Sequence, residues 1–202
     1  EVTRLLDELF TTLTTEVHRR HGSVVDFAGD SMLCWFDGAP RNSTHAPSPS
    51  PVDRAAATAV AMRRAMLQRR SRSTGDGREY DLDVKIAIAS GAANRFVVGD
   101  PRIRRMLVLT GRPIDRAASG EQLARAGEIV CSAEVAARLS SSVPLREQRE
   151  TPEGERYFVF GDTVLELRDD SWPACPILTI EQVRPWLLPS VAERLERGAG
   201  EF

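Results

Sequence analysis

The residues in this sequence with the clearest potential for chemistry are Gly29 and Asp30, a Gly-Asp pair between two short apolar runs. The runs cover residues 24–27 and 31–36, and such a pair between strand-like runs is a signal for a tight hairpin. A carboxylate at a hairpin tip is exposed and can reach a cation. Aspartate is also a common turn residue, and the dipeptide by itself favours that simpler role. The pattern predicts a hairpin and leaves the chemistry of Asp30 open.

A helix must precede this hairpin and another must follow it. Apolar residues recur at steps of three and four over residues 2–20, which predicts an amphipathic helix, and Gly22 is expected to be its C-cap glycine. Residues 38–52 are rich in proline and serine and predict a flexible loop. Asp53 is then expected to cap an alanine-rich helix that runs to about residue 70.

The second half of the sequence predicts a sheet with further helices. Strands are expected at 82–89, 95–98, 106–109 and 129–131, and helices at 111–126 and 133–139. Residues 157–160 and 164–167 predict a second hairpin that turns at Gly161 and Asp162. Residues 168–176 predict a linker, and 180–195 a helix interrupted at Pro185 and Pro189.

This order of elements predicts an α+β fold, with an antiparallel sheet and helices on one face. A ferredoxin-like βαββαβ core would need one more strand ahead of the first helix, and here the sequence opens directly into that helix. We therefore expect a ferredoxin-like domain whose first strand is missing from this stretch.

Composition limits the classes of partner. The 202 residues carry a formal net charge of −2, which supplies no basic field for nucleic acid or for an anionic membrane. No apolar run approaches the ~20 residues that a membrane-spanning helix needs. The 3 cysteines are scattered and predict neither a disulfide framework nor a zinc site. We expect a cytoplasmic domain with no nucleic-acid partner and no membrane segment.

Three ordered blocks of this sequence resemble the class III adenylate/guanylate cyclase homology domain. They are HGSVVDFAGDSMLCWF at 21–36, VKIAIASGAANRFVVGD at 84–100 and MLVLTGRPIDRAASGEQLARAGEIVCS at 106–132. In order, they resemble the family's second and third strands with their GD turn, its central pair of strands, and the strand and helix that carry its transition-state residues. The resemblance spans roughly residues 3–140 and is greatest to the first, metal-donor domain of tandem soluble-type adenylate cyclases.

The resemblance implies a domain organisation. Residues 1–167 would form an N-terminally incomplete cyclase homology domain. Residues 168–202 would form a linker and a connector helix that lead to a second cyclase homology domain. That second domain would be the partner, because in this family both domains contribute to each site.

The resemblance also implies a reaction and its metal ions. In the family, the 3′-hydroxyl of the nucleotide attacks the α-phosphate and pyrophosphate leaves. Two magnesium or manganese ions, held by two aspartates, stabilise the attacking and leaving oxygens. Asp30 matches the second of these aspartates. The first lies on the strand that this sequence lacks, so both ions would be shared with that missing residue.

Residues that would contact the phosphates of ATP follow from the same resemblance. Gly29 and Ser31 flank the metal aspartate. Arg102, Arg104 and Arg105 lie near the place where the metal-donor half offers a basic residue to the β- and γ-phosphates. The local spacing does not select one of the three, and a solvated charge cluster is an equal alternative.

Five positions depart from the family pattern. Asp26 stands where the family has its base-reading lysine, and Val108 stands where that lysine's Asp or Thr partner would be. Asp115 replaces the ribose-orienting asparagine, and Ser119 replaces the transition-state arginine, whose charge a hydroxyl cannot supply. Asp26 and Ala118 occupy the positions that grip bicarbonate in regulated relatives, so bicarbonate sensing by those contacts is not expected.

A retained metal aspartate beside a lost base-reading set implies the metal-donor half of a cyclase that converts ATP to cAMP. The preference for ATP over GTP rests on the resemblance alone. A regulatory or dimerisation domain that kept the fold and lost the chemistry is the main alternative, and an unrelated ferredoxin-like binding module is a third.

Overall fold

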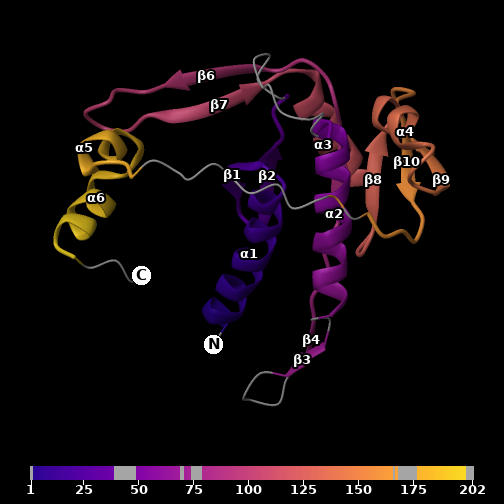
Figure 1. Ribbon diagram of the computed structural model, residues 1–202, viewed down its shortest axis with the longest axis horizontal. Helices are drawn as coiled ribbons and strands as arrows, with labels where there is room; N and C mark the ends of the chain where they lie inside the picture. The colour runs from indigo at the N-terminus through magenta and orange to yellow at the C-terminus, as the bar shows by residue number, and fades with distance from the viewer. Residues whose placement is uncertain are drawn as a thin grey trace.

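The computed structural model describes residues 2–38, 49–68, 71–73, 79–165, 167 and 177–198 of the chain. Two long helices, α1 (Val2–Arg19) and α2 (Pro51–Leu67), contact each other in the middle of the molecule (Figure 1). A four-stranded sheet lies on the other side of α2. Among the described residues, no helix has the length and apolar character that crossing a membrane requires.

The main sheet has the strand order β5 (Ile86–Ile88), β8 (Ile129–Ser132), β10 (Arg156–Phe160) and β9 (Leu145–Glu150). β10 pairs antiparallel with both of its neighbours, whereas β5 and β8 are parallel. The parallel pair arises because the chain crosses from one strand to the other through α3 (Arg112–Leu123). The α+β class is confirmed, with this one parallel pair inside a sheet that was expected to be antiparallel. The expectation of helices on one face was wrong: α2 and α4 (Ala133–Leu139) pack against Ile129 and Cys131, whereas α3 lies on the opposite face, beside Val130.

The remaining strands in the described part of the chain form three antiparallel hairpins. β1 (Ser23–Ala28) pairs with β2 (Ser31–Trp35), β3 (Ser71–Ser73) with β4 (Glu79–Asp81), and β6 (Asn94–Val98) with β7 (Met106–Thr110). The β6–β7 hairpin reaches away from α1 and α2, and its turn lies beside the C-terminal helices α5 (Ile180–Val183) and α6 (Pro189–Glu196) (Figure 1). A short 3-10 helix, Arg184–Trp186, joins α5 to α6, and Pro189 occupies the first turn of α6. The expected interruptions at the two prolines are therefore confirmed.

The core joins α2 to the sheet and to α4 (Ala133–Leu139). Its buried side chains come from all three, and small residues on α2 let the helix approach the strands closely; they include Val52, Ala56, Ala59, Val60, Ile129, Cys131, Val135, Leu139 and Phe160. A second cluster, Leu13, Val17, Met62 and Met66, joins α1 to α2 and packs on the β1–β2 hairpin. The hairpin is thus attached to the domain through the two helices.

The end of α1 differs from the expectation. His21, not Gly22, has the left-handed conformation, with φ of 56°. The Gly22 amide donates to the Val17 carbonyl at 3.0 Å and the His21 amide to the His18 carbonyl at 3.0 Å, which is the Schellman pattern with His21 at the left-handed position. Glycine at 22 has a packing reason, because a Cβ there would lie 2.5 Å from Cε1 of Phe36.

The start of α2 also differs. Ser50 is the N-cap, and Asp53 is the third helical residue that closes a capping box with it. The helix therefore begins at Pro51, inside the expected loop 38–52, and ends at Leu67 rather than near 70. Residues 39–48 of that loop lie outside the described part of the chain.

The expected hairpin of 157–160 with 164–167 was wrong. β10 pairs with β9, a strand that the sequence reading missed, and the described residues 161–165 and 167 are not in a strand. β9 reads Leu-Arg-Glu-Gln-Arg-Glu and lies at the sheet edge, where polar side chains face water. The strand expected over 82–89 is shorter, with β5 limited to Ile86–Ile88.

Candidate active site

Asp30 stands at the tip of the β1–β2 hairpin. Ala28 pairs with Ser31 across the end of the ladder, so Gly29 and Asp30 form the two-residue turn that the sequence predicts. Gly29 has a positive φ of 64°, which suits glycine at the first position of a tight hairpin turn. Both turn residues, Gly29 and Asp30, are exposed, and so is Ser31 at the start of β2. The carboxylate is therefore open to a cation from solvent.

The side chains below the tip hold the hairpin and do not add ligands. Phe27 packs edge-to-face against Phe10 of α1, with ring centroids 5.4 Å apart. The register shifts between Val24 and Asp26, which is a β-bulge in β1. Burial raises the pKa of the Cys34 thiol to about 12, so this cysteine stays protonated at neutral pH and is a poor metal ligand.

A magnesium ion fits the chemistry of this tip. Mg²⁺ prefers oxygen ligands and is commonly held by one or two carboxylates together with substrate phosphates. Within the described part of the chain, no three His, Cys, Asp or Glu side chains gather as a metal site. If an ion binds at this tip, Asp30 would offer one carboxylate to it.

The three arginines lie together in the turn between β6 and β7. Arg102 forms a two-pronged ion pair with Asp100, with distances of 3.2 Å from Nε to Oδ1 and 2.9 Å from Nη2 to Oδ2. This pairing lowers the pKa of the Asp100 carboxyl, and the hydrogen bonds to Arg102 are the main cause. Arg104 is exposed, and the Arg105 amide donates to the carbonyl of Pro185.

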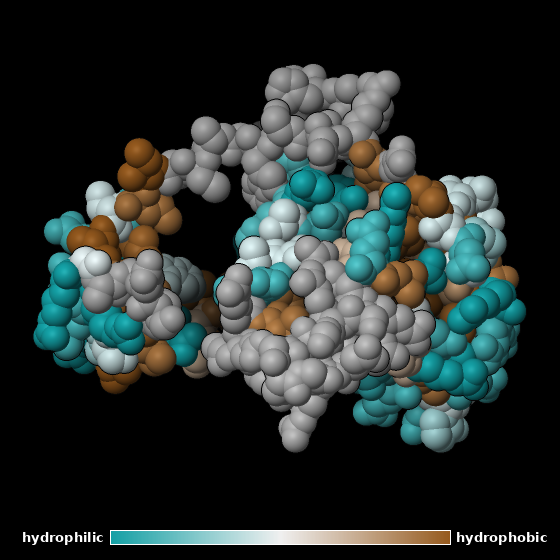
Figure 2. All heavy atoms as spheres, turned by 90° about the horizontal axis from the view of Figure 1, so that it is seen from below, coloured by the Kyte–Doolittle hydropathy of each residue, from teal (hydrophilic) through white to brown (hydrophobic). Residues whose placement is uncertain are grey.

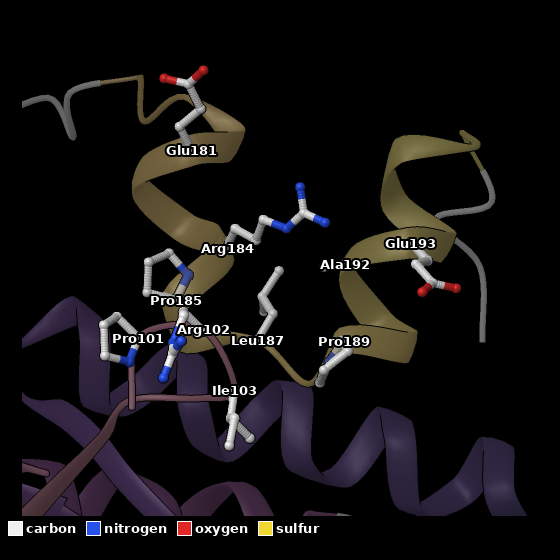
Figure 3. A pocket seen from close by; sticks show the side chains of 10 residues that line it. All are labelled: Pro101, Arg102, Ile103, Glu181, Arg184, Pro185, Leu187, Pro189, Ala192 and Glu193. Atoms are coloured by element: carbon white, nitrogen blue, oxygen red, sulfur yellow. The ribbon is translucent and has the colours of Figure 1, made fainter. Parts of the chain in front are cut away.

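This turn also borders a cavity of about 310 Å³ against the C-terminal helices. The lining includes Ile103, Leu187 and Ala192, and Arg184 extends between α5 and α6 (Figure 3). Arg184 itself pairs with Glu196 at 3.2 Å. The structure thus places the arginine turn next to residues 177–198, and the phosphate-binding role of Arg102, Arg104 and Arg105 stays a prediction.

The five departing positions fall on three elements. Asp26 is exposed on β1, and Val108 is half-buried on β7 opposite Phe96. Asp115 and Ala118 are exposed on α3. Ser119 is half-buried on the same helix. The buried Tyr157 hydroxyl donates to the Arg116 carbonyl of that helix at 2.9 Å.

The model of the adenylate and guanylate cyclase catalytic domain family matches residues 1–166 of this chain. The chain belongs to this cyclase family. The match covers the three hairpins, the central helices and the main sheet. Among curated protein sequences, none matches this cyclase chain at a significant level.

Solved cyclase structures share the fold. The adenylyl cyclase CyaB from P. aeruginosa superposes with a TM-score of 0.65 and 20% identity, over 84% of this chain and 85% of that one. The guanylate cyclase domain of RhGC from Catenaria anguillulae, in complex with GTP, gives 0.60 and 20%, over 80% and 82%. The non-canonical dimeric guanylyl cyclase domain of RhoGC from Blastocladiella emersonii gives 0.58 and 19%, over 77% and 80%.

Sequence reasoning missed one residue that bears on this cyclase site. Arg54 of α2 donates hydrogen bonds to main-chain carbonyls just before β1 and just after β2, at the base of the β1–β2 hairpin. Its partners are backbone carbonyls, which no pattern of side chains in the sequence reveals. Arg54 lies outside the three blocks that carry the family resemblance.

Proposed function

We propose that this chain is the metal-donor half of a class III adenylate cyclase, which converts ATP to cAMP and pyrophosphate when it pairs with a base-reading cyclase domain. The exposed carboxylate of Asp30 at the hairpin tip carries this proposal. Residues 1–167 would form the cyclase domain, and 168–202 the linker and connector to its partner. We place the protein in the cytoplasm, where ATP and magnesium are supplied.

In this proposal, the chain binds and orients the phosphate end of the substrate. Two bound Mg²⁺ or Mn²⁺ ions would supply the positive charge that stabilises the attacking and leaving oxygens. Asp30 would bind these ions together with an aspartate from outside the described hairpin. Gly29 and Ser31 would lie beside the phosphates, and an arginine of the β6–β7 turn would offset charge on the leaving pyrophosphate.

The partner must bring the groups that this chain has lost. Asp26 cannot read a base as a lysine does, and the neutral Ser119 hydroxyl cannot offset transition-state charge. Since the similar structures include adenylyl and guanylyl cyclases, they do not select the base. The choice of ATP rests on the resemblance to tandem soluble-type adenylate cyclases.

Exposed apolar side chains support a partner domain. The β6–β7 hairpin exposes 51% of Phe96, 55% of Val97 and 46% of Met106. Apolar residues also show among the polar ones on the part of the surface formed by this hairpin's turn and the C-terminal helices (Figure 2). Contiguous exposed apolar side chains can mark an interaction site. One structure of the RhoGC cyclase domain is described as a non-canonical dimer, and others are described as monomeric.

The test is turnover of the complete natural protein with Asp30→Ala. Loss of a metal ligand that contributes about 3 kcal/mol of transition-state stabilisation would lower cAMP formation by at least about 100-fold. Asp26→Ala is the matched control, because it removes an exposed carboxylate from the same hairpin. We expect that control to keep its turnover. Equal activity of the Asp30 variant and the parent protein would refute the metal role.

The second candidate is a regulatory or dimerisation domain that no longer takes part in catalysis. The acidic side chain at 115 and the hydroxyl at 119 favour it, because both positions lack the family's chemistry. This candidate predicts that Asp30→Ala leaves turnover unchanged while disruption of the Phe96 and Met106 surface alters it. The 202-residue chain alone is expected to give no turnover with ATP and Mn²⁺ under either candidate.

A further inference from the structure

Arg54 joins three segments that meet at the base of the β1–β2 hairpin. Its Nη1 donates to the carbonyls of Arg20 at 3.1 Å and His21 at 2.8 Å, where α1 ends, and its Nη2 donates to the carbonyl of Asp37, just after β2. Its guanidinium carbon lies 5.9 Å from the centre of the Phe36 ring. One side chain of α2 therefore holds the entry and the exit of the hairpin.

The three acceptors of this arrangement are main-chain carbonyl oxygens, which suit a cationic donor; burial lowers the pKa of the Arg54 guanidinium, and the Asp37 carboxylate opposes that shift. The last carbonyls of a helix lack partners within the helix and carry partial negative charge. The Arg54 guanidinium donates to the Arg20 carbonyl at the C-terminal end of α1, to the adjacent His21 carbonyl and to a third acceptor beyond β2. Its acceptors are main-chain atoms, so the contact constrains the path of the backbone rather than one flexible side chain.

Close packing beside Arg54 makes the base stiff. A Cβ at Gly22 would lie 2.5 Å from Cε1 of Phe36 and 2.8 Å from Cγ1 of Val17, so these side chains fill the space next to the backbone. The Gly22 amide is bound to the Val17 carbonyl, and β1 begins at the next residue. The hairpin base has little room to tilt while Arg54 and Phe36 are in place.

The tip depends on this base, because it has few contacts of its own. Gly29, Asp30 and Ser31 are exposed, and Phe27 is 50% exposed although it touches Phe10. At a rise of about 3.3 Å per residue, β1 is about 17 Å long. A tilt of the hairpin by about 5° at its base would therefore move the tip by about 1.5 Å. Displacements of about 1 Å can cost catalysis on the order of 100-fold.

We propose that Arg54 is a positioning residue that sets the direction of the β1–β2 hairpin and thereby the place of the Asp30 carboxylate. This inference rests on the proposed metal role of Asp30. Lysine cannot replace Arg54, because one ammonium lacks the planar fork that reaches carbonyls on both sides of the hairpin base. Arg54→Lys keeps the positive charge but removes the planar group that donates hydrogen bonds to both sides of the hairpin base.

Two measurements test this role. In the complete natural protein, Arg54→Lys should lower kcat at least about 10-fold and raise the Mn²⁺ concentration for half-maximal rate at least about 3-fold, since the carboxylate is displaced rather than lost. In the 202-residue chain, hydrogen exchange of the β1 and β2 amides should become at least about 10-fold faster, while that of β8 and β10 is unchanged. Arg63→Lys is the matched control, because Arg63 lies on the same helix and donates to the Gly161 carbonyl at 3.3 Å, away from the hairpin.

The outcomes separate the two proposals. If Asp30→Ala keeps full turnover, the metal role fails, and the exchange measurement still decides whether Arg54 holds the hairpin. If Asp30→Ala loses turnover but Arg54→Lys shows the same metal dependence as Arg63→Lys, the positioning role is overturned. Unchanged exchange of the hairpin amides in Arg54→Lys overturns it as well, whatever the turnover.

Discussion

Glu128 is a buried carboxylate that links the edge strand β9 to the start of β8. Its replacement tests how much this ionised group contributes to the stability of the fold. Its Oε2 accepts from Arg149 Nη1 at 2.6 Å and from the Arg125 amide at 2.9 Å, and its Oε1 accepts from Arg149 Nη2 and Arg146 Nη2 at 3.0 Å. The side chains of Glu128 and Arg149 are only 9% and 10% exposed. The pair is therefore shielded from solvent screening.

These partners lower the pKa of Glu128 from its ordinary 4.5 to about 2, with the Arg149 hydrogen bonds as the largest cause. Since each tenfold change in proton binding is worth about 1.4 kcal/mol, the ionised group contributes about 3 kcal/mol to stability at neutral pH. A lowered pKa means that this stability is present above the ordinary pKa and is lost as the pH falls through about 2. Less than about half of it remains at pH 3.

Glu128→Gln keeps the shape of the side chain and removes the charge. At pH 7 we expect the free energy of unfolding to fall by about 3 kcal/mol, which corresponds to a Tm lower by roughly 6–12 °C for a chain of this size. Urea titrations followed by circular dichroism at pH 7 and at pH 3 measure this directly. The gap between the two proteins should shrink by more than half at the lower pH.

The control for this series is Glu153→Gln, which changes an exposed glutamate in the turn between β9 and β10. Its effect should stay within about 0.5 kcal/mol at both pH values. A Glu128→Gln gap of the same size at pH 7 and pH 3 would refute the reasoning, because the loss would then come from packing and not from the charge.

Two further predictions concern the elements that carry the hairpin. Gly22→Ala should destabilise the protein by about 1–3 kcal/mol, because the new Cβ would overlap Phe36, whereas Gly38→Ala, with nothing within 4 Å of its Cβ, should have little effect. Thermal denaturation compares the two, and equal Tm values would contradict the close packing at the hairpin base. Ser50→Ala should cost about 0.5–2 kcal/mol, since the Ser50 hydroxyl accepts from the Asp53 amide at 3.2 Å in the capping box. Urea unfolding measures this loss, and an unchanged midpoint would show that the cap carries no stability.

The hairpin was predictable because its signal is local. A Gly-Asp pair between two strand-like runs specifies a two-residue turn wherever the runs pair, and the structure confirms the pairing of Ala28 with Ser31. Family membership was also predictable from ordered blocks, and the cyclase family model confirms it. The roles of Asp30 and of the arginines in the β6–β7 turn stay predictions, because in the proposal they need groups from a second cyclase domain.

Helix ends were harder to predict from the sequence, because neighbouring residues are equally suited to the same capping position. Ser50 and Asp53 are both good caps, and the chain uses them as the two halves of one capping box. Gly22 could have been the left-handed residue after α1, but His21 takes that conformation and Gly22 serves the approach of Phe36. A sequence shows which residue types are present, whereas the distance to Phe36 exists only after folding.

The sequence by itself determined the turn at Gly29 and Asp30, the amphipathic helices and the family, since these depend on neighbours in the chain and on ordered motifs. Only the tertiary structure decided that β9 pairs with β10, because an edge strand of polar residues has no apolar alternation to reveal it. It also decided the place of Arg54, whose partners lie 17, 33 and 34 positions away along the chain. Backbone carbonyls are the same in every residue, so only their arrangement in space can select the side chain that binds them.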